Sequence, residues 1–369
     1  MFLESLQLSH FRNLKETQVS LNPRFNYVYG DNGAGKTALL EAIYLLSRGR
    51  SFRSGQAQTI ITHSEKEFVV LGRTNNEVGD EQHNLGLSKT TAGETRIRID
   101  GLNANRSSEL ARLLSVQVVL PGAADLIFQA PGLRRSYLDF GLFHVEPNYL
   151  QTSRSYRQAL QQRNAWLKAA EDSVVLEDDP WLDQVTQHGI RLSEMRDGYV
   201  ASLLPHLESA MSALAPEIDL SINYQWGGLE DSEIAAKKLS ESFPRDVKFG
   251  VTHRGPHRAD LELLSEGYVA AEVLSRGQAK AAAIALILAQ ASLQQALTKR
   301  ESVILIDDFG AELDAAHWQR FVQGLQALNC QVIATSTDAP APNSDWFDAL
   351  ECDVFHVEQG QITKMERAK

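Results

Sequence analysis

The chain has 369 residues, enough to bury a large core and to form two or three structural units. Its 47 acidic and 36 basic residues give a formal net charge of −11, which argues against a protein that coats nucleic acid over its whole surface. A local basic groove is still compatible with this charge. Two isolated cysteines, Cys330 and Cys352, exclude a disulfide framework and a CxxC zinc site, and they fit a reducing cytosol.

No targeting or membrane segment is expected. Residues 1–15 lack the basic and apolar regions of a signal peptide. The longest apolar run, residues 281–289, is shorter than the roughly 20 residues that span a membrane, and a buried helix explains it. We therefore expect a cytoplasmic protein that makes no membrane contact.

The first 50 residues predict a strand, a glycine loop and a helix in direct succession. Residues 2–8 and 17–21 alternate apolar and polar side chains, as in an antiparallel strand pair. Residues 25–29, FNYVY, form a short buried strand, and residues 39–46 form a helix with one apolar face. The loop between them, residues 30–37, therefore has the setting that a phosphate-binding loop requires.

The loop GDNGAGKT matches the pattern GxxxxGK[ST] in full. Its glycines let successive backbone N–H groups point inward at phosphates, and the helix that follows adds its positive N-terminal end. Lys36 is expected to reach the β- and γ-phosphates, and Thr37 to offer its hydroxyl to Mg²⁺. The predicted nucleotide contacts are Gly30, Asp31, Asn32, Gly33, Ala34, Gly35, Lys36 and Thr37.

The middle of the chain predicts a β-rich segment and then a helical one. Short strands are expected at residues 68–72, 83–87, 95–100 and 116–120. Helices are expected at 149–170 and 181–214, with an acidic break between them. These two helices form either a projecting arm or an ordinary subdomain packed on the core, and the sequence favours neither.

The last hundred residues return to alternating helices and strands. A helix at 278–298 precedes a strand at 303–306, a helix at 317–328 and a strand at 331–336. The strand VILI ends in Asp307 and Asp308, and a buried strand that delivers acids at its carboxyl end is what a Walker B site needs. Asp307 is the predicted Mg²⁺ ligand together with Thr37, and Asp308 could orient the attacking water. The predicted catalytic residues are Lys36, Asp307 and Asp308.

Residues 274–278, LSRGQ, open the helix that precedes Walker B. Ser275 can cap that helix, and Gly277 permits close approach of a phosphate. The segment resembles the LSGGQ signature of ABC-type ATPases, in which the signature of one protomer closes on ATP held by the other. The resemblance implies nucleotide contacts from Ser275, Arg276, Gly277 and Gln278, and an ATP-dependent head-to-head dimer.

Residues 311–314 look like the D-loop of that class, but residues 335–338, TSTD, stand where its switch histidine is expected. This departure, and Asp308 in place of the usual glutamate, imply slow, switch-like hydrolysis. The absence of NKxD favours adenine, hence ATP.

We expect an α/β fold: an ABC-type P-loop ATPase head with a β-rich subdomain and an inserted helical arm domain. The expected domains are 1–145 (head with Walker A), 146–245 (arm) and 246–369 (head with signature and Walker B).

The opening FLESLQLSHFRNL together with YGDNGAGKT is similar to the heads of SMC-like ATPases, and most closely to the RecF family. Further similar segments span nearly the whole chain: GRSFRSG (49–55), APGLRRSYLDF (130–140), GPHRADLEL (255–263), LSRGQAK (274–280) and LIDDFGAELD (305–314). The resemblance implies ATP-dependent dimerisation and binding of duplex DNA and single-strand/duplex junctions. It also implies a role in gap repair and replication restart, in which members of the family work with RecR and RecO to load RecA onto single strands.

Basic residues are candidates for DNA contact. Residues 134–168 hold six Lys or Arg against two acids: Arg134, Arg135, Arg154, Arg157, Arg163 and Lys168. Arg48, Arg50 and Arg53 form another basic group. We expect any single one of these to pair with an acid or to bury its stem, and only a subset to face DNA. The roles of His257 and Arg258 stay open.

Three other functions are weighed against this one. A chromosome-organising or break-repair head of the same superfamily needs long coiled coils, and no heptad run is sustained here. The nucleotide-binding subunit of an ABC transporter is disfavoured by the FRN opening and the missing switch histidine. A non-catalytic ATP sensor is disfavoured because Lys36 and both carboxylates are intact.

Overall fold

The structure is a computed structural model that describes residues 1–76, 81–170, 174–308, 315–339 and 352–366. It divides the chain into two compact units. The discontinuous unit comprises Met1–Ala123 and Gln294–Lys369, and the inserted unit comprises Ala124–Leu293. The two ends of the chain therefore build one unit together.

The discontinuous unit contains a six-stranded sheet in the order β15-β14-β3-β13-β12-β8. Five of its strands are parallel, and β15 runs antiparallel to β14. The bounds are β3 (Phe25–Tyr29), β8 (Val116–Val119), β12 (Val303–Ile306), β13 (Gln331–Ser336), β14 (Cys352–Glu358) and β15 (Gln361–Met365). Because parallel strands end at the same sheet edge, the segments that follow β3, β12 and β13 can meet there.

A second sheet of six antiparallel strands has the order β2-β1-β4-β5-β6-β7. Its strands are β1 (Phe2–Phe11), β2 (Leu14–Ser20), β4 (Glu67–Asn75), β5 (His83–Thr90), β6 (Thr95–Ile99) and β7 (Leu102–Ala104). This sheet is the predicted β-rich subdomain, completed by the N-terminal strand pair.

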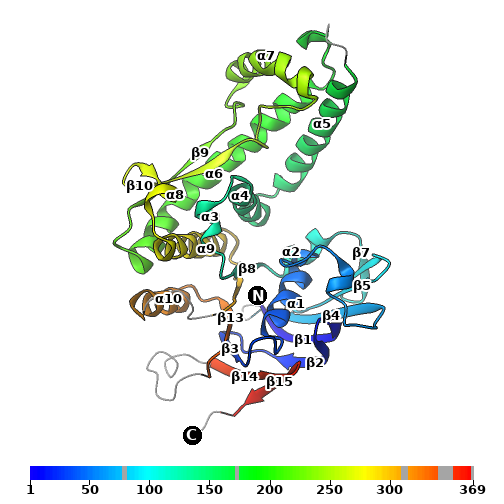
Figure 1. Cartoon of the computed structure of the whole chain (residues 1–369), viewed down its shortest axis with the longest axis vertical. Coiled ribbons are helices and arrows are strands. Elements are labelled where there is room, and N and C mark those ends of the chain that lie inside the picture. The colour runs from blue at the N-terminus through cyan, green and yellow to red at the C-terminus, as the bar shows by residue number, and fades with distance from the viewer. Residues whose placement is uncertain (77–80, 171–173, 309–314, 340–351, 367–369) are drawn as a thin grey trace. The chain divides into compact units, whose positions relative to one another are not determined.

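Helix α1 (Lys36–Arg48) packs against strands of both sheets (Figure 1). Leu39, Leu40, Ile43 and Leu46 are fully buried, so the helix is enclosed by the core rather than lying on the surface. It ends where Gly49 adopts a left-handed φ of 68°, a conformation that favours glycine at a helix C-terminus. The unit also holds η1 (Ala57–Thr59), α2 (Ser107–Leu113) and α10 (Ala315–Ala327).

The inserted unit is mainly helical. Its helices are α3 (Asp125–Phe128), α4 (Gly132–Val145), α5 (Tyr149–Ala169), η2 (Leu176–Asp178), α6 (Leu182–Leu214), α7 (Ser232–Phe249), α8 (Ala270–Val273) and most of α9 (Arg276–Thr298). Its strands, β9 (Leu220–Gln225), β10 (Asp260–Ser265) and β11 (Tyr268–Val269), form one small antiparallel sheet. The two predicted arm helices are α5 and α6, and they pack along one another (Figure 1).

The compact units do not share the boundaries of the three predicted domains. Residues 124–145 and 246–293 belong to the inserted unit, because α4 packs on α6 and β10 pairs with β9. Sequence patterns show single elements, whereas these contacts join elements far apart along the chain. The assignment of residues 246–293 to the ATPase head stays a prediction.

Helix α9 is the one helix in the described residues with the length and apolar composition of a membrane span. Of its most apolar window, 67% is buried inside the protein. Four of its alanines, Ala282, Ala283, Ala285 and Ala289, have no exposed surface. The burial fits a core helix, as the sequence predicted.

Candidate nucleotide site

The predicted phosphate-binding loop connects β3 to α1. At two of its positions only glycine fits, because of a positive φ at one and a close backbone contact at the other. Gly35 has a φ of 127°, which side chains disfavour, and it forms the N-cap of α1. A Cβ on Gly30 would lie 2.2 Å from the carbonyl oxygen of Val357 on β14. The loop therefore fits closely against the sheet and needs glycine at both positions.

The side chain of Lys36 folds back into this loop. Its ammonium donates hydrogen bonds to the carbonyl oxygens of Gly30 at 2.6 Å and Asp31 at 2.9 Å. The residue is 9% exposed, so its charge is concentrated inside the loop. A phosphate held by the loop would meet an ammonium that is already in place.

Asn13, which follows β1, also holds the loop. Its Nδ2 donates to the carbonyl oxygens of Gly33 at 3.0 Å and Ala34 at 2.9 Å. The sequence pattern predicts only a turn at residues 10–13 and no role for this side chain. A turn residue that tethers a distant loop leaves no periodic signal in the sequence.

Asp307, the carboxylate predicted for Walker B, lies beside the first residues of α1. The hydroxyl of Thr37 lies 3.0 Å and 3.1 Å from the two carboxylate oxygens of Asp307, which follows β12. A hydroxyl beside a carboxylate supplies the oxygen ligands that Mg²⁺ prefers, with the remaining positions left to water and phosphate. Among the described residues there is no cluster of three or more His, Cys, Asp or Glu suited to a metal.

Thr335, at the end of β13, joins the two acids. Its hydroxyl donates to Asp307 Oδ1 at 2.8 Å and accepts the backbone N–H of Asp308 at 3.0 Å. Asp308 is exposed and has a left-handed φ of 59°, a conformation that aspartate tolerates better than most side chains. The segment without the switch histidine therefore contributes a hydroxyl that contacts both acids.

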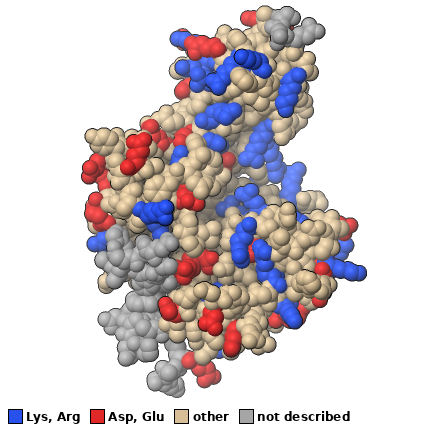
Figure 2. Space-filling model, in the orientation of Figure 1, with Lys and Arg blue, Asp and Glu red and all other residues tan. Residues whose placement is uncertain are grey.

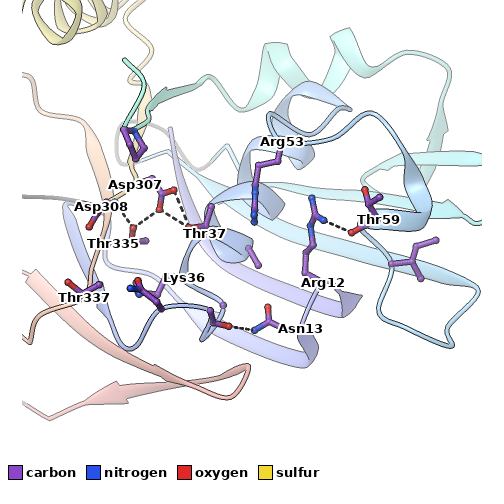
Figure 3. A pocket seen from close by; sticks show the side chains of 16 residues that line it. Arg12, Asn13, Lys36, Thr37, Arg53, Thr59, Asp307, Asp308, Thr335 and Thr337 are labelled. Carbon is purple, nitrogen blue, oxygen red and sulfur yellow. Dashed lines mark hydrogen bonds between the residues drawn. The ribbon is translucent and has the colours of Figure 1, made fainter. Parts of the chain in front are cut away.

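These residues line a pocket of about 580 Å³ (Figure 3). One part of its wall is the predicted constellation of Lys36, Thr37, Asp307 and Asp308. Another part comprises residues that the sequence did not assign to it: Arg12, Asn13, Arg53, Thr59, Ile61, Pro121, Thr335 and Thr337. The sequence predicts that Arg53 pairs with an acid, buries its stem or faces DNA. It does not predict a place in this pocket, because a basic cluster carries no information about the cavity it faces.

The predicted signature residues lie in the inserted unit, at the start of α9. The backbone N–H of Ser275 donates to the side-chain oxygen of Gln278 at 3.0 Å, and the N–H of Gln278 donates to the Ser275 hydroxyl at 3.3 Å. This reciprocal pair is a capping box, so Ser275 does cap the helix. Ser275, Arg276 and Gly277 are exposed. The predicted D-loop, residues 311–314, lies outside the described residues.

Two of the predicted basic residues are structural. Arg134 forms a two-pronged ion pair with Asp260, at 2.8 Å for both contacts. Arg163 is fully buried and donates to Asp179 at 2.7 Å and Asp246 at 2.8 Å. Neither guanidinium is available to DNA, as expected for most of the cluster. The sequence could not single out these two, because their partners are up to 126 residues away.

Other basic side chains remain exposed. Figure 2 shows Lys and Arg side chains gathered over the inserted unit near α5 and α7. The exposed residues there include Arg154, Arg157, Lys168, Arg245 and Lys248. Arg157 lies 3.8 Å from Asp139, a contact too exposed to neutralise its charge.

His257 has a structural role. Its Nε2 donates to the carbonyl oxygen of Thr252 at 2.9 Å, which leaves Nδ1 to accept the hydroxyl of Tyr156 at 2.6 Å. Burial lowers the pKa of His257 to about 4, and the nearby cations Arg258 and Arg135 act in the same direction. The imidazole is therefore neutral and fastens its loop to α5. Arg258 itself is exposed.

Comparisons with known proteins extend over the whole chain. The family model described as "RecF/RecN/SMC N terminal domain" matches residues 2–362. The DNA replication and repair protein RecF of Stutzerimonas stutzeri is 38% identical over 99% of this chain and 98% of its own length. The RecF of Pseudomonas fluorescens strain Pf0-1 is 37% identical, with the same coverage of both chains.

Solved structures agree with these relatives. The structure described as the recombination mediator protein RecF-ATP in the RecFOR pathway superposes with a TM-score of 0.86 at 26% identity, covering 99% of this chain and 98% of that one. An SMC head bound to the C-terminal winged-helix domain of ScpA superposes with a TM-score of 0.60 at 16% identity, covering 100% of this chain and 98% of that one, and it supports the fold alone. The fold is that of an ABC-type ATPase head, as predicted, and the chain belongs to the RecF family of SMC-like ATPases.

Proposed function

We propose that this protein binds ATP in the pocket at the end of β3 and acts in recombinational repair of DNA. The observation that carries the proposal is the meeting of Thr37 with Asp307, at 3.0 Å, beside a complete phosphate-binding loop. Residues from opposite ends of the chain come together there. A chance glycine turn would not bring a carboxylate to the first helical turn in this way.

Within that pocket, backbone N–H groups of residues 30–37 cradle the phosphates, and Lys36 contacts the β- and γ-phosphates. Thr37 and Asp307 hold Mg²⁺, which neutralises charge on the phosphate oxygens when it is bound. Asp308 orients the attacking water. Hydrolysis is slow and serves as a switch, because Asp308 is shorter than a glutamate and residues 335–338, at the end of β13 and just after it, contain no histidine.

The exposed start of α9 suits a contact made across a dimer. Ser275, Arg276, Gly277 and Gln278 contact the γ-phosphate of ATP bound by a second copy, so ATP joins two protomers head to head. Binding of duplex DNA and single-strand/duplex junctions, with RecR and RecO as partners in loading RecA onto single strands, follows from membership of the RecF family. The protein works in the cytoplasm.

The other functions are weaker. Chromosome-organising SMC proteins need long coiled coils, whereas the inserted unit is a compact body of 170 residues with its own small sheet. A transporter subunit must dock on a membrane permease, and no observation favours such a contact. Relatives that match over nearly their full length are repair proteins.

The proposal is tested by measuring dimerisation and DNA binding with ATP, with ADP and without nucleotide. The wild type is compared with Lys36→Met, which removes the ammonium from the loop, and with Ser275→Arg, which places a large side chain at the start of α9. We expect ATP alone to dimerise the wild type and to strengthen its binding to gapped duplex DNA. Lys36→Met is expected to lose ATP binding by about a hundredfold, consistent with removing a charged hydrogen-bond donor from the phosphates.

Two outcomes would contradict different parts of the proposal. If ATP neither dimerises the wild type nor changes its DNA affinity, the protein is not an ATP-controlled DNA-binding protein. If Ser275→Arg still dimerises with ATP, the start of α9 does not lie in the dimer contact. Raising the salt concentration should weaken DNA binding steeply if phosphates are the main contacts.

A further inference from the structure

A carboxylate that the proposed reaction does not use lies beside the nucleotide pocket. Glu41 is on α1, five residues after Lys36, and its side chain has no exposed surface. A buried carboxylate is costly unless cations and hydrogen-bond donors surround it. Such a group is retained when its partners do something that an apolar side chain in its place could not.

Two segments, the turn after β1 and residues 51–59, supply the partners of Glu41. Arg12, from the turn after β1, forms a two-pronged ion pair with distances of 2.9 Å from Nε and 2.7 Å from Nη2. Ser51, which follows α1, donates its hydroxyl to the same carboxylate. Arg53 places Nη1 at 3.9 Å from Glu41 Oε2. Arg12 also donates to the carbonyl oxygen of Thr59, which ties the 51–59 segment to the β1–β2 turn.

The network is closed on one side and open on the other. The side chain of Arg12 is 19% exposed and that of Arg53 is 50% exposed, and both line the nucleotide pocket. In Figure 3 their guanidinium groups lie on the side of the pocket opposite Asp307 and Asp308. The carboxylate thus holds two cations at the wall of a cavity that is expected to receive an anion.

We propose that Glu41 is a positioning residue for nucleotide binding. It fixes Arg12 at the pocket wall and keeps Arg53 in reach, so that these guanidinium groups meet the phosphate oxygens of the bound nucleotide. The contact between Arg53 and Glu41 is long and half exposed, so Arg53 can exchange it for a charge-assisted hydrogen bond to phosphate. The inference rests on the proposed function, because it assumes that the pocket takes a nucleoside triphosphate.

The first measurement is the affinity of Glu41→Gln for ATP. Glutamine keeps the size of the side chain and removes its charge, so the arginines lose their anchor while the helix keeps its packing. We expect affinity to fall about tenfold, the equivalent of one charge-assisted hydrogen bond, while kcat at saturating ATP stays within about threefold. A purely structural role would lower the melting temperature and leave the dissociation constant of the folded protein unchanged.

The second measurement is a double-mutant cycle with Arg53→Gln, a half-exposed site where substitution does not threaten folding. If Glu41 acts through Arg53, the two substitutions together weaken ATP binding by less than the product of their separate effects. Effects that multiply would overturn the part of the inference that runs through Arg53. An ATP affinity for Glu41→Gln equal to that of the wild type would overturn the whole inference.

The matched control is the pair Glu4 and Arg73 on the second sheet. Their charged groups lie 3.0 Å apart and their side chains are 40% and 49% exposed, but neither lines the pocket. Glu4→Gln and Arg73→Gln should leave ATP affinity unchanged. The proposed function is tested separately, on the wild type alone, by its ATP binding and by the effect of ATP on its dimerisation and DNA affinity.

Discussion

The two units each contain a buried cluster of guanidinium and carboxylate groups, and the clusters differ in what they face. In the inserted unit, Arg163 and its partners Asp179 and Asp246 have side chains with no exposed surface. In the discontinuous unit, Glu41 is equally buried, but its partners Arg12 and Arg53 extend to the wall of the nucleotide pocket. The chemistry is the same, and only one cluster leaves charge available to a ligand.

The difference separates a structural ion pair from a functional one. Both clusters join segments that are distant along the chain, so both restrain the fold. The cluster of Arg163, Asp179 and Asp246, which we call the sealed cluster, has no exposed side-chain surface that a ligand could reach, so breaking it should affect folding alone. The cluster of Glu41, Arg12 and Arg53, which we call the open cluster, can exchange a protein contact for a ligand contact. Altering it should therefore affect ligand binding more than the stability of the fold.

The largest effect is expected from breaking the sealed cluster. Asp246→Ala removes the acceptor of Arg163 and of the backbone N–H of His253, and it leaves a buried guanidinium short of a partner. We expect a loss of about 3–5 kcal/mol in the free energy of unfolding, measured by urea denaturation. The folded fraction should bind ATP as the wild type does. A loss below about 1 kcal/mol would place this pair among weak surface contacts.

The second-largest effect is expected at Thr335, whose hydroxyl contacts Asp307 and the backbone N–H of Asp308. Thr335→Val keeps the shape of the side chain but removes both the hydrogen bond to Asp307 and the acceptor of the Asp308 N–H. We expect ATP hydrolysis to slow by about tenfold to a hundredfold, as for other groups that orient metal ligands, with little change in ATP affinity.

A matched control for Thr335→Val is Thr74→Val on β4. Thr74 is also fully buried and donates to a backbone carbonyl, that of His83, at 3.4 Å. It does not line the nucleotide pocket. Equal loss of hydrolysis in both variants would mean that general destabilisation, and not the orientation of Asp307 and Asp308, explains the result.

The sequence was sufficient for the parts of the site that are contiguous. Residues 30–37 and Asp307 were predicted because each motif follows a recognisable strand, and parallel strands bring their carboxyl ends together. The roles of Arg12, Glu41 and Arg53 were not predicted. Each has an ordinary local setting, in a turn, in a helix and in a loop, and its role arises only when the three segments meet.

The same reason explains the helical part. The pattern of residues 149–170 and 181–214 predicted α5 and α6 closely, since long amphipathic helices are decided by local periodicity. The pattern did not predict that residues 124–145 and 246–293 would pack with them. It also could not distinguish Arg163 from Arg154, because the burial of an arginine depends on carboxylates elsewhere in the chain.

The smallest expected effect is a dependence of stability on pH. It comes from His257, which hydrogen-bonds to the same residue as Arg163 of the sealed cluster. Thr252 receives a hydrogen bond from Arg163 on its hydroxyl and one from His257 on its backbone carbonyl. The folded pKa of His257 is about 4, below the ordinary value of 6.5, so the unfolded chain binds the proton more tightly. Stability is therefore complete above about pH 6.5 and declines as the pH falls toward 4. We expect about 1 kcal/mol less stability at pH 5.5 than at pH 7.5, and His257→Gln should flatten that slope. If the stability of the variant falls with pH as steeply as that of the wild type, other groups cause the acid sensitivity, and His257 does not link the sealed cluster to pH in this range.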